Sequence, residues 1–154
     1  MTPTDDPDPS PPVEDLGLTD ALVQLSFVVQ GVLSRIAADH GLSIAQVRVL
    51  GVLRDREPGM QQLAHHLHLD KSSVSGLIDR AERRGLVIRL PASEDGRAVN
   101  VSPTPTGRKV IAEVERTVGL ELSGLARSLS HREQGQLSRL ASRLALVDSR
   151  AIDE

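Results

Sequence analysis

The middle of the chain contains two consecutive segments whose apolar residues recur with the period of a helix. The first spans residues 61–69, and its apolar positions are Leu63, Ala64 and Leu67. The second spans residues 70–85 and has apolar residues at i, i+3, i+4 and i+7, namely Val74, Leu77, Ile78 and Ala81. Gly85 suits the end of the second segment, because glycine commonly follows the last turn of a helix. We therefore expect two helices joined by a short turn.

Two short β-prone runs follow, at residues 86–90 and 97–101. Residues 91–96 separate them and end in Asp95-Gly96, which favours a hairpin. A helix-turn-helix followed by a hairpin is the arrangement that places the second helix in a DNA major groove. The alternative is an ordinary α+β domain with solvated serines, and the combination of elements favours DNA binding over it.

The second predicted helix carries short hydroxyl and basic residues outside its apolar stripe. Ser72, Ser73 and Ser75 lie where a helix N-terminus approaches phosphates and base edges. Arg97 follows the turn tip, where it can reach a minor groove or pair with Asp70. The predicted DNA-contacting residues are Lys71, Ser72, Ser73, Ser75, Gly76, Arg80, Arg83, Arg84 and Arg97. The residues expected to support the wing are Asp70, Asp95 and Gly96.

These residues resemble the MarR family of bacterial winged-helix regulators. The motifs that carry the resemblance are Leu63-Ala64, residues 70–87, residues 95–98, and residues 101–104 followed by Gly107. The resemblance spans roughly residues 18–147, with the flanking helices matched by layout. It implies a homodimer that binds a pseudo-palindromic duplex DNA site, usually as a repressor released by a small ligand. Two departures are Gly76, which implies fewer base contacts, and Pro103, which we expect to shorten the second strand.

Apolar stripes on both sides of this region predict long flanking helices. The expected helix starts are Thr19, the capping box Ser43–Gln46, Thr104-Pro105 and the capping box Ser130–Glu133. The expected fold is mostly α with a small β-wing (α+β): a winged helix-turn-helix lobe plus long helices that form a dimerisation platform. The expected divisions are a disordered acidic, proline-rich tail (1–16), a helical dimerisation region (17–40 and 104–150) and a winged helix-turn-helix region (41–103). A monomeric core is the alternative for the flanking helices.

The net charge of −3 is unevenly distributed along the chain. Residues 1–15 hold five acidic residues and no Lys or Arg, whereas residues 69–109 carry a net charge of +3. Positive charge is therefore concentrated where DNA is expected to lie. The chain has one Phe and no Tyr or Trp, and binding of single-stranded nucleic acid by stacking needs aromatic side chains. Duplex DNA is the partner that remains.

An apolar, anionic or phenolic effector is expected to bind between the helical platform and the winged-helix lobe, since ligands prefer concave junctions. The candidate wall residues are Leu25, Val29, Val32, Ile36, Val47 and Leu50. Arg48 is a candidate charge for the effector if its side chain turns inward, and an exposed salt bridge is the alternative. We expect the effector to release DNA by moving the DNA-reading helices.

Other chemistry is sparse. His65, His66 and His68 lie close together, but residue 66 points away from the helix face shared by the other two, and the chain has no Cys. We therefore expect no metal and no cofactor. No phosphate-binding loop or nucleophile elbow is present, so an enzyme is not expected. No apolar run approaches about 18 residues, and residues 1–6 lack the pattern of a signal peptide. We expect a cytoplasmic protein without a membrane helix.

Two further functions are compatible with the same winged helix. One is a protein-interaction module that has lost DNA binding, for which a basic wing tip has no use. The other is a metal-responsive regulator, in which a chelator changes the affinity for DNA.

Overall fold

The computed structural model describes residues 14–92 and 98–150 and contains six α-helices and one two-stranded sheet over these ranges. The elements are α1 (Gly17–Asp39), α2 (Ile44–Leu53), α3 (Met60–Leu67), α4 (Lys71–Arg83), β1 (Val87–Pro91), β2 (Val99–Pro103), α5 (Pro105–Leu125), the short 3-10 helix η1 (Ala126–Ser128) and α6 (His131–Arg150). The expected fold class is confirmed. The predicted acidic tail lies almost entirely outside the described residues.

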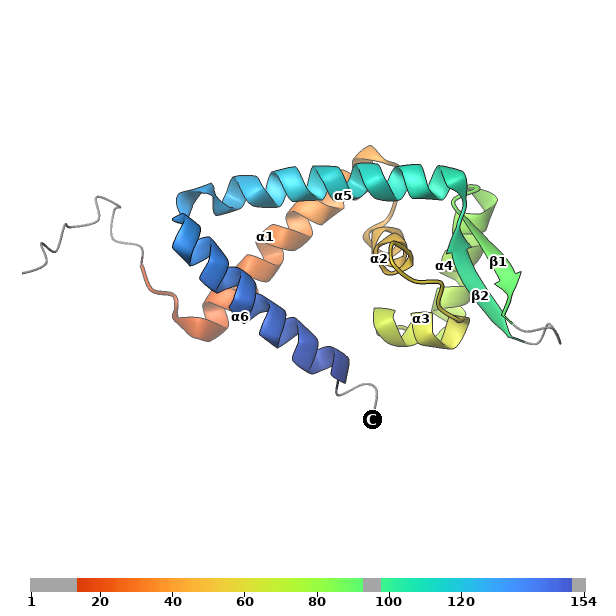
Figure 1. The fold of residues 1–154 in the computed structure, drawn as a ribbon, viewed down its shortest axis with the longest axis horizontal. Coiled ribbons are helices and arrows are strands. Elements are labelled where there is room, and N and C mark those ends of the chain that lie inside the picture. The colour runs from red at the N-terminus through yellow and green to blue at the C-terminus, as the bar shows by residue number, and fades with distance from the viewer. Residues whose placement is uncertain (1–13, 93–97, 151–154) are drawn as a thin grey trace, which may run out of the picture.

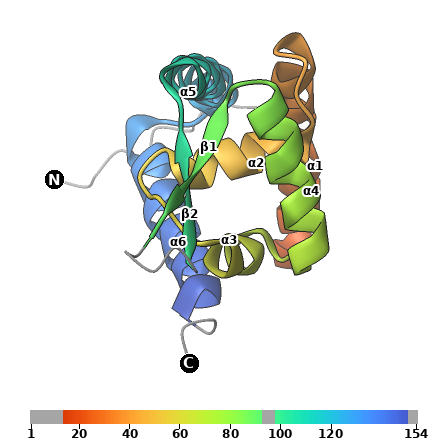
Figure 2. The same cartoon turned by 90° about the vertical axis from the view of Figure 1, so that its right-hand side faces the viewer.

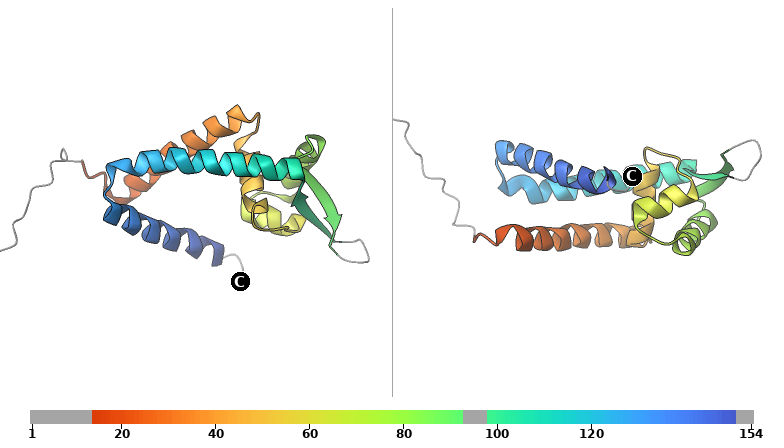
Figure 3. Two further views of the ribbon diagram at one scale, coloured as in Figure 1. Left: turned by 45° about the horizontal axis from the view of Figure 1, so that its top comes forward. Right: turned by 90° about the horizontal axis from the view of Figure 1, so that it is seen from below.

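The molecule has two ends, joined by the long helix α5 (Figure 1). The elements α2, α3, α4 and the β-hairpin gather at the start of α5, with the hairpin and α4 on opposite sides of this lobe (Figure 2). At the other end, α1 crosses α5 obliquely, and α6 turns back toward the lobe (Figures 1 and 3). We call the first end the winged-helix lobe and the second end the helical platform.

The core belongs to the lobe. Its fully buried side chains include those of Leu53, Leu63, Leu67, Val74, Ile78 and Val101. The predicted apolar stripe of α4 is confirmed, because Val74, Leu77, Ile78 and Ala81 are all buried. The C-terminal part of α1 and the first half of α5 close this core through Ile36, Ile111 and Val114.

The platform helices leave most of their apolar side chains exposed in the single chain. On α1 these are Leu18, Leu22, Val23, Leu25, Phe27 and Val28, and on α5 and α6 they include Leu120, Leu125, Leu137, Leu140 and Leu144. Large exposed apolar patches commonly mark a surface that another molecule covers.

Helix α1 is also long and apolar enough to cross a membrane, by length and composition alone. The sequence did not predict this, because polar residues interrupt the apolar run. The last turns of α1 nevertheless bury Ile36 and Ala37 in the lobe core. Arg35 of α1 forms an ion pair with Glu121 of α5 at 2.7 Å. These contacts anchor the C-terminal half of α1 to the rest of the protein.

Helix caps follow the sequence signals at three of the four expected starts. Ser43 and Gln46 form a reciprocal capping box, and Thr104 caps α5 with Pro105 in its first turn. Ser130 and Glu133 exchange hydrogen bonds at the start of α6. The prediction that Thr19 starts the first helix is wrong. Helix α1 begins at Gly17, whose N–H donates to the Asp15 carboxylate at 2.9 Å. The Asp15 carboxylate thereby satisfies one of the N–H groups that lack a partner at the start of the helix.

Both strands begin later than expected, and the expectation that Pro103 shortens β2 is wrong. The antiparallel register pairs Val87 with Pro103 and Pro91 with Val99. Pro103 is the last residue of its strand, and the next residue, Thr104, donates its N–H to the Leu86 carbonyl at 3.0 Å. A proline at the end of a strand removes no ladder hydrogen bond that the sheet needs.

Candidate nucleic-acid interface

Asp70 organises the start of α4. As the N-cap residue, it accepts a hydrogen bond from the Ser73 N–H at 2.9 Å. The hydroxyls of Ser72 and Ser73 each donate to one oxygen of the same carboxylate, at 2.5 Å. These hydroxyls, with the Ser73 N–H, hold the pKa of Asp70 well below its usual range. Since both hydroxyl hydrogens are used, Ser72 and Ser73 offer mainly acceptor oxygens to a ligand.

The face of α4 opposite the core is exposed and basic. Lys71, Arg80 and Arg83 are exposed, and none of them forms an ion pair with another residue in the described ranges. Gly76 lies in the middle of this face, and a Cβ there would lie 3.4 Å from Nη1 of Arg80. The absence of a side chain at Gly76 therefore lets the Arg80 guanidinium lie close along the helix.

The structure gives Arg84 a role other than the predicted DNA contact. Its Nη1 donates to the Gly41 carbonyl at 2.6 Å and its Nη2 to the His40 carbonyl at 3.2 Å. These carbonyls follow the C-terminus of α1. The basic doublet Arg83-Arg84 is thus divided: Arg83 is exposed on α4, whereas Arg84 joins α4 to α1. Neighbouring helix positions point about 100° apart, and the sequence alone does not say which arginine finds an internal acceptor.

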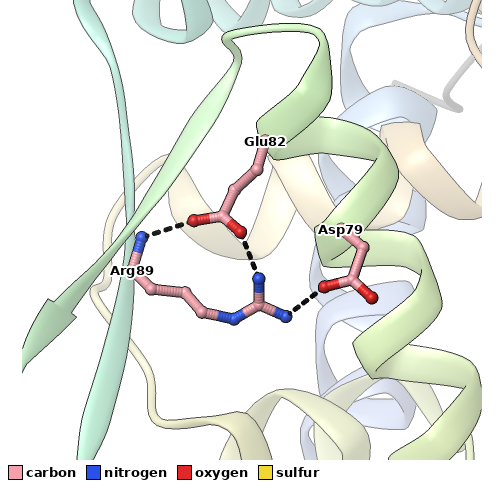
Figure 4. Close-up of polar contacts among 3 residues, drawn as sticks. All are labelled: Asp79, Glu82 and Arg89. Carbon is pink, nitrogen blue, oxygen red and sulfur yellow. Dashed lines mark hydrogen bonds and ion pairs between the residues drawn. The ribbon is translucent and has the colours of Figure 1, made fainter.

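One important residue was missed by the sequence analysis. Arg89 of β1 reaches across to α4, where its guanidinium contacts the carboxylates of Asp79 and Glu82 (Figure 4). The distance to Asp79 is 2.7 Å, and the backbone N–H of Arg89 also donates to Glu82 at 3.0 Å. Partial burial lowers the pKa of Arg89, but the two carboxylates outweigh it and raise that pKa above its ordinary value. The sequence did contain a signal for this contact. Two acidic residues lie three positions apart on the predicted helix, and a single arginine follows in the next strand.

This triad matters for the charge of the α4 surface. Asp79 and Glu82 are carboxylates on the helix expected to face phosphates, where uncompensated negative charge would oppose binding. Arg89 compensates part of that charge from the side of the hairpin. The predicted wing-tip residues Asp95, Gly96 and Arg97 lie outside the described residues, as does the predicted pairing of Arg97 with Asp70.

A crevice of about 320 Å³ lies between α2 and α5. Val47 and Leu50, two of the predicted wall residues, line it together with Ile111, Val114 and Val118 of α5. At its rim, Arg54 pairs with Glu115 at 3.2 Å. The α5 residues and Arg54 were missed, because a repeating apolar stripe does not say which helix it will face.

The other predicted wall residues lie elsewhere. Val32 and Ile36 are buried in the core at 7% and 2% exposure. Leu25 is 46% exposed on the outer part of α1, and Val29 is half-buried on the same helix. Arg48 does not turn into the crevice, since its Nη2 donates to the Leu67 carbonyl at the end of α3, at 3.1 Å. The described residues contain no group of three or more His, Asp or Glu side chains arranged to hold a metal ion.

Comparisons with known proteins agree with this geometry. A family model described as "MarR family" matches residues 40–98. The HTH-type transcriptional regulator YkoM of Bacillus subtilis is 30% identical over 104 residues, which cover 67% of this chain and 68% of that protein. The homoprotocatechuate degradative operon repressor of Escherichia coli is 27% identical over 139 residues, covering 88% and 93%. A transcriptional regulatory protein for the hcr operon of Thauera aromatica is 32% identical over 60% of this chain, but this match spans only 57% of that protein.

Solved structures share the whole fold. The transcriptional regulator PA4135 superposes with a TM-score of 0.72 at 26% identity, covering 85% of this chain and 97% of that one. NadR, in complex with 4-hydroxyphenylacetate, superposes with a TM-score of 0.70 at 23% identity, covering 88% and 97%.

Proposed function

Because this chain belongs to the MarR family, we propose that it is a homodimeric repressor that binds a pseudo-palindromic duplex DNA site. The observation that carries the proposal is the division of α4 into a buried apolar stripe and an exposed basic face. Lys71, Arg80 and Arg83 occupy that face without ion-pair partners in the described part of the chain. Basic side chains left without internal partners are available to replace the counterions of DNA phosphates.

Within the proposed interface, each group of residues has a distinct task. Lys71, Arg80 and Arg83 contact phosphates and fix the register of the protein on DNA. The hydroxyl oxygens of Ser72, Ser73 and Ser75 lie near base edges, and Gly76 allows the backbone of α4 to approach the groove closely. Arg97, at the wing tip with Asp95 and Gly96, enters the adjacent minor groove.

The second copy of the chain covers the exposed apolar surface of α1, α5 and α6. Two-fold symmetry then presents two α4 helices to successive major grooves on one side of the duplex. This assembly accounts for the exposed leucines of the platform without a membrane, and we place the protein in the cytoplasm. One relative is named as the repressor of a degradative operon and another as a transcriptional regulator, which supports the same proposal.

The effector of this repressor is a small apolar acid or phenol that binds the crevice between α2 and α5. Val47 and Leu50 join α5 side chains in an apolar wall, and Arg54 at the rim binds the acid by exchanging its ion pair with Glu115 for one with the effector. The complex of NadR with 4-hydroxyphenylacetate supports this chemical class. Suppose that the effector binds tenfold more tightly to a conformation in which the two α4 helices are wrongly spaced for DNA. With one effector site in each protomer, the free-energy difference between the two conformations then shifts by roughly 2.7 kcal/mol.

Selection of bound sites from a library of random duplexes tests the proposal. The recovered sequences should form an inverted repeat with half-sites about 10 base pairs apart. Recovery of unrelated sequences would contradict sequence-specific DNA binding and favour the alternative of a protein-interaction module. In the same format, aromatic carboxylates that raise the melting temperature should also release the recovered duplex.

A further inference from the structure

We propose that the outer side of α2 and α3 carries a second binding site, which takes a small organic carboxylate. A hollow of about 370 Å³ lies there, at the lower end of the range for small-molecule sites. Arg48, Arg54, Arg56 and His66 line it, and we call it the basic hollow. It is distinct from the α2–α5 crevice, although Arg54 borders both.

Positive charge in the basic hollow exceeds negative charge. Asp55 is the carboxylate in its lining, and Arg54 already pairs with it at 2.7 Å. Arg54 is further engaged by Glu115 at 3.2 Å. Neither Arg48 nor Arg56 forms an ion pair among the residues that the structure describes, although Asp55 also interacts electrostatically with Arg56. Two guanidinium groups beside one hollow attract an anion.

The contacts that Arg48 and Arg56 do make leave most of their donors available. Arg48 donates one hydrogen bond to the Leu67 carbonyl at 3.1 Å. Nη1 of Arg56 lies 3.1 Å from Nε2 of His66. Each guanidinium has five donors, so the hollow offers several N–H groups to a carboxylate.

Compensation of helix termini is a competing explanation for these arginines. Cations commonly lie near helix C-termini, and α2 and α3 both end beside the basic hollow. That explanation accounts for the bond from Arg48 to Leu67 but not for Arg56, which binds an imidazole rather than a helix carbonyl. The lining also includes Val52 and Leu67, which favour a ligand with an apolar body over a bare inorganic ion.

Binding of benzoate to the full-length protein tests this site without reference to DNA. In spectra of the ¹⁵N-labelled protein, benzoate should shift the Nε–H signals of Arg48 and Arg56 in a saturable manner. Arg56→Gln and Arg48→Gln should each weaken this binding about tenfold, since each removes a charge-assisted hydrogen bond. Arg116→Gln, an exposed change on α5, is the matched control and should leave the affinity unchanged.

Three results would overturn the proposal. One is an affinity for benzoate that neither Arg48→Gln nor Arg56→Gln alters. Another is a set of shifts confined to Val47, Ile111 and Val118, which would assign benzoate to the crevice alone. The third is tighter binding of inorganic phosphate than of benzoate at the same arginines, which would show that the apolar lining plays no part. None of these results bears on whether α4 reads DNA.

Discussion

Arg89 and Glu82 are joined twice, once through the backbone N–H of Arg89 and once through its guanidinium. One of these residues lies on strand β1 and the other on α4, so this pair fixes the hairpin to α4 (Figure 4). Asp79 extends the contact along α4 by one further turn. The orientation of the wing relative to α4 therefore depends on a half-buried network of three side chains.

Arg89→Ala should lower the free energy of unfolding by about 1–3 kcal/mol, because it leaves two partly buried carboxylates without their cation. It should also weaken DNA binding, since the same carboxylates then face phosphates unopposed. Urea denaturation monitored by circular dichroism measures the first effect. Arg116→Ala, an exposed arginine on α5, is the control and should change stability by less than about 0.5 kcal/mol. Equal stability of the two variants would show that the network is not structural.

The neighbours Arg83 and Arg84 should behave differently when replaced by alanine. Arg83→Ala should keep its melting temperature but make the slope of log affinity against log salt shallower by about 2 per dimer, because one phosphate contact is lost from each protomer. Arg84→Ala should instead lose about 1 kcal/mol of stability with its bonds to His40 and Gly41. Salt titrations and thermal unfolding of both variants separate the two roles. The assignment fails if Arg84→Ala produces the larger change in salt slope.

Gly107, in the first turn of α5, lies against the segment that joins α4 to β1. A Cβ at this position would lie 1.9 Å from the Leu86 carbonyl oxygen, which is backbone and cannot swing away. Gly107→Ala should therefore destabilise the protein by at least about 2 kcal/mol. Gly124→Ala in the same helix meets open space and should be neutral or stabilising by up to about 1 kcal/mol. Parallel denaturation curves test the contrast, and similar curves would mean that the joint between α5 and Leu86 is loose.

Asp70 predicts a pH dependence of stability with a definite sign. Its pKa is lowered in the folded protein, so its charged form stabilises the fold above the unfolded pKa, and this contribution is lost as the pH falls toward the lowered value. Asp70→Asn keeps an accepting oxygen but not the charge. The melting temperature of the variant should be lower than that of the native chain at pH 7, and the gap should narrow below about pH 4. A gap that stays constant from pH 7 to pH 3 would contradict the role of the charge.

The sequence predicted the elements that depend on local signals. The reciprocal bonds of Ser43 and Gln46 and the stripe from Val74 to Ala81 require only residues close in the chain, and the structure contains them. What it did not predict were contacts between distant elements. Arg89 with Asp79, Arg84 with Gly41, and α5 as a wall of the crevice all depend on how helices and strands pack. Periodicity identifies a buried face but not the element that buries it.

Arg48 illustrates the same limit for a single side chain. Its position on α2 allowed a side chain turned into the α2–α5 crevice or one held in an exposed ion pair. The guanidinium instead meets the last carbonyl of α3. This acceptor could not be predicted from the sequence, because it is a backbone carbonyl oxygen and every residue type has one.

The most direct test of the account is a competition titration at physiological salt. A fluorescent duplex that carries the selected inverted repeat is displaced by the unlabelled repeat or by a scrambled duplex of equal length and composition. The account predicts that the repeat competes at least about 10³-fold more effectively than the scrambled duplex, with one dimer bound per repeat. Equal competition by the two duplexes would contradict a sequence-specific repressor.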